Sequence, residues 1–472
     1  MSVPNVAIPP AAVRRALYPL HERLLRRPTF AYLAELEAGQ WQSRAVVEAR
    51  QAERLGALLR VAHAHCPWHR ERMDAAGLEP GSDGEPVSLE TLRRLPPMTK
   101  ADARAAGDAA VWHGVPGGAQ RSNTGGSSGE PLIFRFGRRR QASDAAGRMR
   151  ARRWWGVEVG EREVYLWGSP VELGRTDRIK TLRDRLFNQL VLNAFDMSPQ
   201  TMDDYIAAIR AFRPACVYGY ASSIALLAAH ARERGTDLCL PGLRVVCTTG
   251  EPLFAHQREL IGEVFGVPVA NEFGSRDIGF TAHESPAGQM LLCSESIILE
   301  VLDPQGEPVA PGEVGEAVMT GLCSEAQPFL RYRTGDMVRV SGAACREGRG
   351  LHVIDEVVGR STDFVVRADG AVMHALSVIY VLRDLEGIAE FRFIQHRVDE
   401  AEILVVPGAG WDATTAEQAR NGLRARLGRE VRVRICEVDA IPPEASGKYR
   451  YVVSHVPLPG ALRVAAGGEG QP

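Results

Sequence analysis

The sequence lacks the features that define several large classes of protein. Its eight cysteines are scattered, and none stands in a Cys-x-x-Cys pair. This pattern predicts reduced thiols and no disulfide framework. No apolar run approaches the roughly 20 residues that span a bilayer, and the N-terminus lacks the basic, apolar and small-residue succession of a signal peptide. We therefore expect a cytoplasmic protein without a membrane partner.

The chain also has little net charge. Its 56 basic side chains are nearly balanced by 58 acidic ones, which leaves a formal charge of −2. A charge this small gives no long-range attraction to a polyanion. The sequence therefore does not predict nucleic-acid binding.

What the chain does have is the size and composition of a multidomain globular protein. Its 472 residues, 45% of them hydrophobic and 24% charged, suit two or three domains with large cores. Helical periodicity between residues 15 and 76 buries Leu55, Leu58, Leu59 and Ala62, and strand-like and helix-like segments then alternate. This alternation favours an α/β fold with buried sheets and flanking helices.

Local signals predict where several elements begin and end. Ser222 and Ser223 are expected to cap a helix that stops at Gly235. After residue 359 the pattern becomes that of a small α+β unit, in which Thr414 or Thr415 starts a helix ending at Gly428. The predicted domains are a large domain at 1–359, a small mobile domain at 360–456 and a disordered tail at 457–472.

The first chemical signal is a cluster of glycines and hydroxyl residues. Backbone N–H groups can crowd around an anion where glycines remove the side chains, and hydroxyls add donors. The cluster lacks the Gly-Lys-Ser/Thr ending of a Walker loop. A flexible loop is the competing interpretation. The residues are Thr124, Gly125, Gly126, Ser127, Ser128 and Gly129.

Two further segments combine an acidic side chain with glycine. The first runs from Asn271 through Glu272, Phe273 and Gly274 to Asp277. An acidic side chain in this segment can hold Mg²⁺, and the aromatic ring of Phe273 can stack on a base. In the second, Thr334-Gly335-Asp336 presents an acid at a tight turn, where it can accept hydrogen bonds from ribose hydroxyls. An ordinary polar loop and an ordinary hairpin turn are the alternatives.

The last two signals lie in the C-terminal part. Gly359-Arg360-Ser361-Thr362-Asp363 stands at the expected domain boundary. Ser446-Gly447-Lys448-Tyr449 places a lysine after a glycine near the C-terminus. Taken alone, such a lysine is usually a solvated surface charge.

The order of these segments is more specific than any one of them. The succession SNTGGSSGEP, TTGEPL, NEFGSRDIG, GEVGEAVMTGL, RYRTGD, GRSTD and SGKYR resembles the adenylate-forming superfamily of acyl-CoA synthetases and adenylation domains. The early LLRVAHA, CPWHR, LPPMTK and GYASS segments are similar to its phenylacetate-CoA ligase-like branch, which includes capsule-biosynthesis homologues. The resemblance extends from about Leu55 to Val456.

The resemblance implies a role for each matching residue. The loop at 124–129 corresponds to the phosphate-gripping loop, Asp336 to the ribose-binding Asp and Arg360 to a nucleotide-contacting Arg. Lys448 corresponds to the catalytic lysine of adenylation, and Asp277 to the acid associated with magnesium. Further ATP contacts are implied at Gly250, Glu251, Pro252, Asn271, Glu272, Phe273 and Gly274, and an acyl pocket at Trp167, Gly168 and Tyr220. Around Trp167, a buried strand with aromatic packing is the alternative.

The chain departs from the family pattern at three places. Asp277 replaces a glutamate, and Thr362 precedes Asp363 at a hinge that usually carries two aspartates. Ser285 and Leu291 stand where some relatives have zinc-binding Cys and His, and Cys345 has no nearby cysteine. One thiol cannot supply a four-coordinate site, so we predict no zinc.

The implied activity is ATP-dependent conversion of a carboxylic acid to its acyl-AMP, followed by acyl transfer. ATP and magnesium are the expected cofactors, and CoA, an amine or a carrier protein the expected acceptor. Two alternatives stay open, namely an enzyme that stops at an adenylylated product and a degenerate nucleotide-binding regulatory protein.

Overall fold

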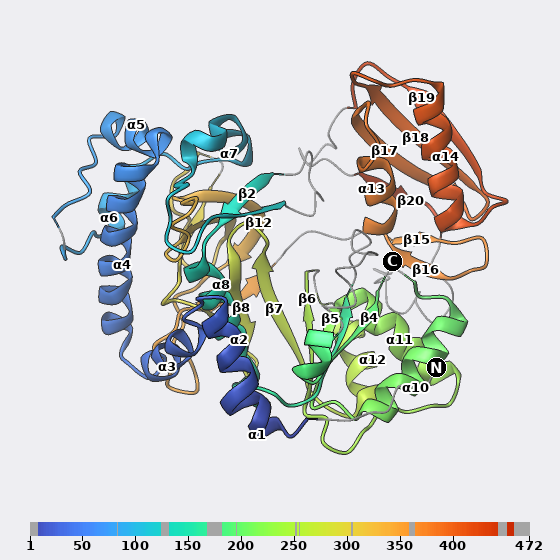
Figure 1. The fold of residues 1–472 in the computed structure, drawn as a ribbon, viewed down its shortest axis with the longest axis horizontal. Coiled ribbons are helices and arrows are strands. Elements are labelled where there is room, and N and C mark those ends of the chain that lie inside the picture. Colours follow the sequence, from blue (N-terminus) through green and yellow to red (C-terminus); the bar gives the residue numbers. More distant parts are fainter. Residues whose placement is uncertain are drawn as a thin grey trace.

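The computed structural model describes residues 8–456 apart from 83, 124–131, 168–181, 195, 251–252, 254, 304, 358–363 and 442–450. The chain forms a large mixed α/β part followed by a separate α+β unit, as the sequence predicts (Figure 1). Within the described residues, no helix is both long and apolar enough to cross a bilayer.

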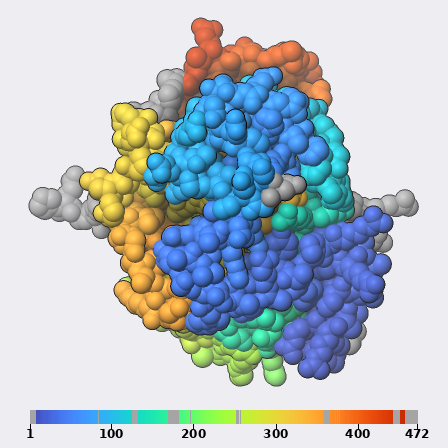
Figure 2. Space-filling model, turned by 90° about the vertical axis from the view of Figure 1, so that its left-hand side faces the viewer, coloured from blue at the N-terminus to red at the C-terminus, as the bar shows by residue number. Residues whose placement is uncertain are grey.

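Helices make up the N-terminal quarter and cover one side of the molecule (Figure 2). The longest buries Leu55, Leu58, Leu59 and Ala62, as their spacing predicts. The elements are α1 (Pro10–Ala12), the π-helix η1 (Val13–Leu17), α2 (Tyr18–Leu24), α3 (Thr29–Gly39), α4 (Arg44–His65), α5 (Pro67–Ala75), α6 (Leu89–Arg93), α7 (Lys100–Ala106) and the 3₁₀ helix η2 (Gly107–Ala110).

The largest sheet runs in the order β13-β9-β8-β7-β6-β5-β3-β4. Its β4, β3, β5, β6 and β7 strands are parallel, and the remaining strands are antiparallel. The strands are β3 (Glu163–Trp167), β4 (Gln189–Asn193), β5 (Cys216–Tyr220), β6 (Val245–Thr249), β7 (Val269–Ser275), β8 (Gly279–Glu284), β9 (Met290–Leu292) and β13 (Val353–Ile354).

Helices cover both faces of the parallel strands. One face packs its apolar side chains against α10 (Pro199–Phe212), α11 (Ala221–Glu233) and α12 (Ala255–Phe265). The other face lies under α8 (Arg138–Trp154) and carries a mixture of apolar and charged groups. Burial on both faces explains the continuous apolar runs of β5 and β6.

A second, antiparallel sheet has the order β10-β11-β12-β14. Its strands are β10 (Ile297–Leu302), β11 (Val314–Gly321), β12 (Tyr332–Arg339) and β14 (Glu356–Val357). A separate antiparallel pair consists of β1 (Gln120–Asn123) and β2 (Ile133–Phe136). The predicted glycine-serine loop joins these two strands in sequence and lies outside the described residues.

The C-terminal unit has its own core, built around Phe391, Phe393, Ile403 and Leu423. Its sheet has the order β19-β18-β17-β20, and β15 pairs with β16. The elements are β15 (Phe364–Val366), β16 (Val372–His374), α13 (Leu376–Arg383), β17 (Ile388–Arg397), β18 (Glu400–Pro407), α14 (Ala413–Leu427), β19 (Arg432–Glu437) and β20 (Val452–Ser454).

Two predicted helix caps are wrong. Helix α11 begins at Ala221, and the buried Ser222 and Ser223 lie inside its first turn. Helix α14 is capped by Asp412, whose carboxylate accepts a hydrogen bond from the Thr415 N–H at 2.8 Å. In both cases the capping position lies before the hydroxyl residues that the sequence offered.

Candidate active site

The carboxyl ends of the parallel strands form the edge that carries most of the predicted site residues that the structure describes. Trp167 ends β3, Tyr220 ends β5, and Gly250 follows β6. Asn271 and Glu272 lie near the same end of β7, which pairs in parallel with β6. Open α/β sheets bind their ligands outside this edge. The fold therefore brings together residues that lie more than 100 positions apart in the sequence.

Aromatic rings pack against one another at this edge. The Trp167 and Tyr220 rings stack with centroids 4.5 Å apart and planes at 15°. Gly250 has φ of 76°, and a Cβ atom there would lie 3.1 Å from the Tyr220 ring. A glycine is thus required both for the backbone angle and for the close approach. That these rings line an acyl pocket stays a prediction.

Asp277 joins two of the predicted motifs. It lies in the turn between β7 and β8 and is buried. The Tyr332 hydroxyl donates a hydrogen bond to its Oδ2 at 2.7 Å, and the Ile278 N–H donates to its Oδ1 at 3.2 Å. The Arg140 guanidinium donates to the Asp277 carbonyl oxygen. These contacts fix the orientation of the carboxylate.

The carboxylate of Asp277 fits a magnesium ion that arrives with a nucleotide. A carboxylate offers about four lone-pair positions, and Asp277 uses two of them. Mg²⁺ in such sites is held by one or two carboxylates, by phosphates and by water. Within the described residues, no cluster of three or more His, Cys, Asp or Glu side chains forms a ready-made metal cage.

Asp336 lies in a β-bulge within strand β12, so the predicted tight turn is wrong. Thr334, Gly335 and Asp336 together stand opposite the single residue Ala317 of β11. Gly335 permits the bulge with φ of 74°. The Thr334 hydroxyl donates to the Ala317 carbonyl oxygen at 2.9 Å and accepts from the Asp336 N–H at 3.2 Å. The bulge presents a half-buried Asp336 from a rigid strand.

Helix α8 faces the sheet with a stripe of charged side chains. Arg140, Asp144, Arg148 and Arg152 repeat every four residues, so they lie on one face of the helix. Arg140 and Asp144 form an ion pair at 3.5 Å. The Asp144 carboxylate also accepts a hydrogen bond from the Phe280 N–H at 3.1 Å. The stripe thereby ties the helix to the turn that carries Asp277.

Glu272 is buried beneath this stripe. The Tyr218 hydroxyl donates to its Oε1 at 2.7 Å, and Arg148 lies 3.7 Å from its Oε2. Burial alone would raise the pKa of the Glu272 carboxyl, but Arg148 and Arg152 outweigh burial and lower it. Glu272 is therefore ionised in the folded protein at neutral pH.

The sequence analysis did not identify Arg140, Arg148, Arg152 or Tyr218 as partners of the predicted site residues. For the three arginines the signal was the four-residue spacing of charges on a helix that packs against a sheet. Such a pattern more often marks a solvated helix face. Here the partners on β3, β5 and β7 show that these side chains face the sheet.

Several predicted residues lie outside the described part of the chain. These are Thr124 to Gly129, Gly168, Glu251, Pro252, Arg360, Thr362, Asp363, Lys448 and the tail from 457. Their roles stay predictions.

Of the positions that the sequence analysis compared with zinc ligands, Leu291 and Cys345 lie in a buried cluster with Leu351 and Val353. Nearby, the His283 Nδ1 lies 2.8 Å from the Glu284 carbonyl oxygen. That the protein lacks zinc stays a prediction.

Comparison with known proteins finds a matching domain family and distant relatives along most of the chain. Residues 365–455 match the model of the CapK C-terminal domain. The chain is 21% identical to Protein CapK of Staphylococcus aureus over 377 residues, which is 79% of this chain and 82% of that protein. It is 26% identical to the phenylacetate-coenzyme A ligase of Thermus thermophilus over 469 residues, or 89% and 99% of the two chains.

A solved structure shares the fold across the whole chain. It is 2-hydroxyisobutyryl-CoA ligase in complex with 2-HIB-AMP and CoA, and it aligns with a TM-score of 0.57 and 21% identity. The alignment covers 98% of this chain and 97% of that one.

Proposed function

Because this chain is a distant homologue in the phenylacetate-CoA ligase and CapK branch of the adenylate-forming ligase superfamily, we propose that it activates a carboxylic acid with ATP and transfers the acyl group. In the first step an oxygen of the acid attacks the α-phosphorus, the bond to the β-phosphate breaks, and pyrophosphate leaves. In the second step a thiol or amine attacks the acyl carbon and AMP leaves.

The observation that carries this proposal is the hydrogen bond between Tyr332 and Asp277. It joins the RYRTGD segment at the start of β12 to the NEFGSRD segment, which forms the end of β7 and the turn after it, at the edge where Trp167, Tyr220 and Gly250 also lie. In the proposed function this edge is where ATP and the acid meet. Independent motifs from three parts of the chain thus converge on one place.

Each described residue then has a defined task. Asp336, held by its bulge, accepts hydrogen bonds from the ribose hydroxyls. The fixed Asp277 carboxylate would hold Mg²⁺, which when bound supplies positive charge to the phosphates. The stacked rings of Trp167 and Tyr220 exclude water from the acyl side of the site.

Residues outside the described part complete the scheme. The 124–129 loop would grip the β- and γ-phosphates, and Lys448 would balance the charge between the carboxylate and the α-phosphate. Rotation of the C-terminal unit between the two steps would let one edge of the sheet serve both reactions.

CoA is the acceptor that we propose first. The Thermus relative is named as a coenzyme A ligase, and the solved ligase with the same fold was captured with CoA. An amine or a carrier protein remains the alternative acceptor, because the described residues include none that selects a thiol.

A pyrophosphate-release screen tests the proposal. The protein is incubated with ATP, Mg²⁺ and a panel of aromatic and aliphatic acids, first alone and then with CoA or simple amines. The proposed function requires release that depends on one acid and a product that carries the acyl group. Adenylylation of a non-carboxylate compound would support the rival transferase, and no turnover with any acid would support a regulatory nucleotide-binding protein.

A further inference from the structure

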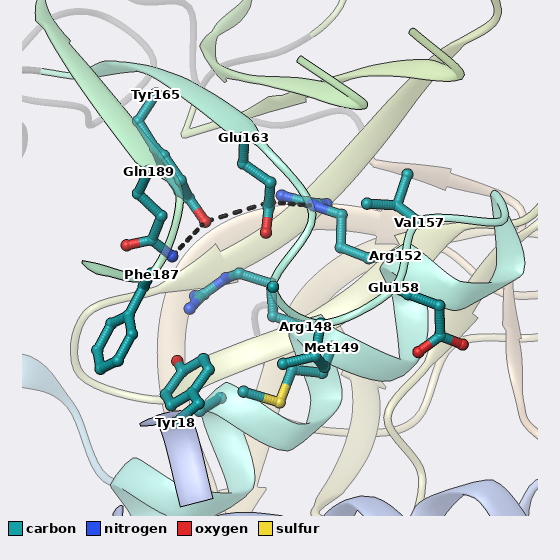
Figure 3. Close-up of a pocket in the computed structure, with 13 residues that line it drawn as sticks. Tyr18, Arg148, Met149, Arg152, Val157, Glu158, Glu163, Tyr165, Phe187 and Gln189 are labelled. Carbon is teal, nitrogen blue, oxygen red and sulfur yellow. Dashed lines mark hydrogen bonds and ion pairs between the residues drawn. The ribbon is translucent and has the colours of Figure 1, made fainter. Parts of the chain in front are cut away.

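A cavity lies away from the carboxyl ends of the parallel strands. It has a volume of about 180 Å³ and is bounded by α8, α2, the segment after α8 and the amino ends of β3 and β4 (Figure 3). None of the predicted active-site residues is among the described residues that line it. The cavity is therefore a separate place in the fold.

Arg148 is the unusual group in this cavity. Its guanidinium makes no hydrogen bond to the described residues, and its buried Nε has no hydrogen-bond partner. Its ionic partner, the Glu272 Oε2, lies 3.7 Å away, too far for a hydrogen bond, and that oxygen also lacks a hydrogen-bond partner. Figure 3 shows the guanidinium projecting into the space beside Tyr18 and Phe187. The Arg148 side chain is 37% exposed, so the N–H donors of its guanidinium are open to a ligand that enters the cavity.

A carboxylate faces the same space. Glu163, at the start of β3, points into the cavity in Figure 3. Its Oε2 accepts from the Tyr165 hydroxyl at 3.2 Å and lies 3.4 Å from the Nε of Arg152. Arg152 also lies over the Tyr218 ring, with 4.7 Å between the guanidinium carbon and the ring centroid. Arg152 is thus the ionic partner of Glu163, as Arg148 is of Glu272.

The rest of the wall is aromatic and apolar. The Tyr18 and Phe187 rings stack with centroids 4.6 Å apart and planes at 15°, and Met149 lies beside them. A cavity of about 150 Å³ accommodates a benzene molecule, so this one has room for a small side chain and a polar head.

We propose that this cavity binds a small free amino acid such as leucine or methionine. Its carboxylate accepts hydrogen bonds from Arg148, its ammonium group faces Glu163, and its side chain packs on Tyr18 and Phe187. The lining charges already balance, and burying an extra unpaired charge is costly, so a zwitterion is favoured over an anion such as phosphate. A guanidinium matches a carboxylate in a bidentate manner.

Calorimetric titration of the full-length protein with leucine and methionine tests the site. Leucinamide and 4-methylpentanoate, which lack the carboxylate and the ammonium group respectively, serve as ligand controls. We expect the amino acids to bind and both analogues to bind at least about tenfold more weakly, since each loses a charge-assisted contact. Equal binding of either analogue, or no heat from any amino acid at millimolar concentration, would overturn the proposal.

Variants separate this site from the active site. Arg148→Gln should weaken binding by about tenfold or more. Ala145→Phe, which fills the cavity without touching its charges, should abolish binding even if Arg148→Gln fails to fold. Arg232→Gln, on an exposed arginine of α11, and Asp336→Ala should both leave binding unchanged. Loss of binding in Asp336→Ala would place the amino acid at the strand ends and overturn the second site.

Discussion

The hydroxyl of Tyr332 lies 2.7 Å from the buried carboxylate of Asp277 and donates a hydrogen bond to it. Tyr332 starts strand β12, which also carries Asp336 four residues later. The bond therefore sets the position of the proposed magnesium-binding carboxylate relative to the strand that would hold the ribose. Two acids from different sheets become parts of one rigid arrangement.

Removing this hydroxyl should disturb both stability and magnesium use. Tyr332→Phe leaves the Asp277 Oδ2 without its donor inside the protein, which we expect to lower the free energy of unfolding by about 1–3 kcal/mol. The freed carboxylate should also raise the Mg²⁺ concentration needed for half-maximal pyrophosphate release. Urea unfolding and a magnesium titration measure the two effects.

A matched control is Tyr205→Phe, because Tyr205 also donates a hydrogen bond, to the Asn193 carbonyl oxygen at 2.9 Å, but lies on α10. It should leave the magnesium requirement unchanged. If Tyr332→Phe behaves in the same way, Asp277 is not the magnesium ligand.

Asp336→Ala should weaken ATP binding. Each lost charge-assisted hydrogen bond to the ribose is worth roughly 1.5–3 kcal/mol, so the affinity should fall by about tenfold or more. The Thr334–Ala317 bond is retained in the variant, so the bulge should persist. Calorimetry with a non-hydrolysable ATP analogue measures the loss. The exposed Asp204 of α10 gives the control Asp204→Ala, and equal affinities of the two variants would remove Asp336 from the nucleotide site.

The buried His69 predicts a loss of stability on acidification. Its ring is fully buried, its Nε2 lies 2.8 Å from the Pro328 carbonyl oxygen, and burial with the adjacent Arg72 lowers its pKa to about 3. In the unfolded chain the pKa is about 6.5. Between these values the unfolded chain binds a proton that the folded protein refuses, so the free energy of unfolding falls as pH falls. The slope reaches about 1.4 kcal/mol per pH unit.

Urea unfolding at about pH 7 and about pH 5 tests this effect. Lowering the pH should reduce the free energy of unfolding of the wild type more than that of His69→Gln, because glutamine carries no titrating group. Parallel pH profiles for the wild type and His69→Gln would mean that folding does not lower the pKa of His69.

The sequence was most informative where chemistry and local pattern coincide. The alternation around Phe391 and Ile403 predicted the C-terminal strands, because one face of each strand packs into the core while the other contacts solvent or a neighbouring element. The order of the glycine-containing motifs predicted residues that the fold brings to one edge of the sheet. The first signal is local, and the second is a resemblance that extends over most of the chain, from about Leu55 to Val456.

The sequence was least informative where partners are distant. The pairing of Arg148 with Glu272 spans 124 positions and exists only because α8 lies over β7. The bulge at Thr334 to Asp336 depends on the register between β11 and β12, which no local pattern fixes. For the same reason, a Thr-Gly-Asp sequence that suits a turn lies within a strand.

Lys448 allows the two proposed half-reactions to be separated. During adenylation a cation must lie beside the carboxylate and the α-phosphate while negative charge redistributes between them. During acyl transfer the charge leaves with AMP, and rotation of the C-terminal unit would carry Lys448 away. Lys448→Ala should therefore lower acid-dependent pyrophosphate release by about 10²-fold or more, the range for one lost electrostatic contact. Transfer from a chemically supplied acyl-adenylate should change far less. Equal losses in both assays would assign Lys448 a structural role or a role in both steps, whereas no loss in either would leave it a solvated surface charge.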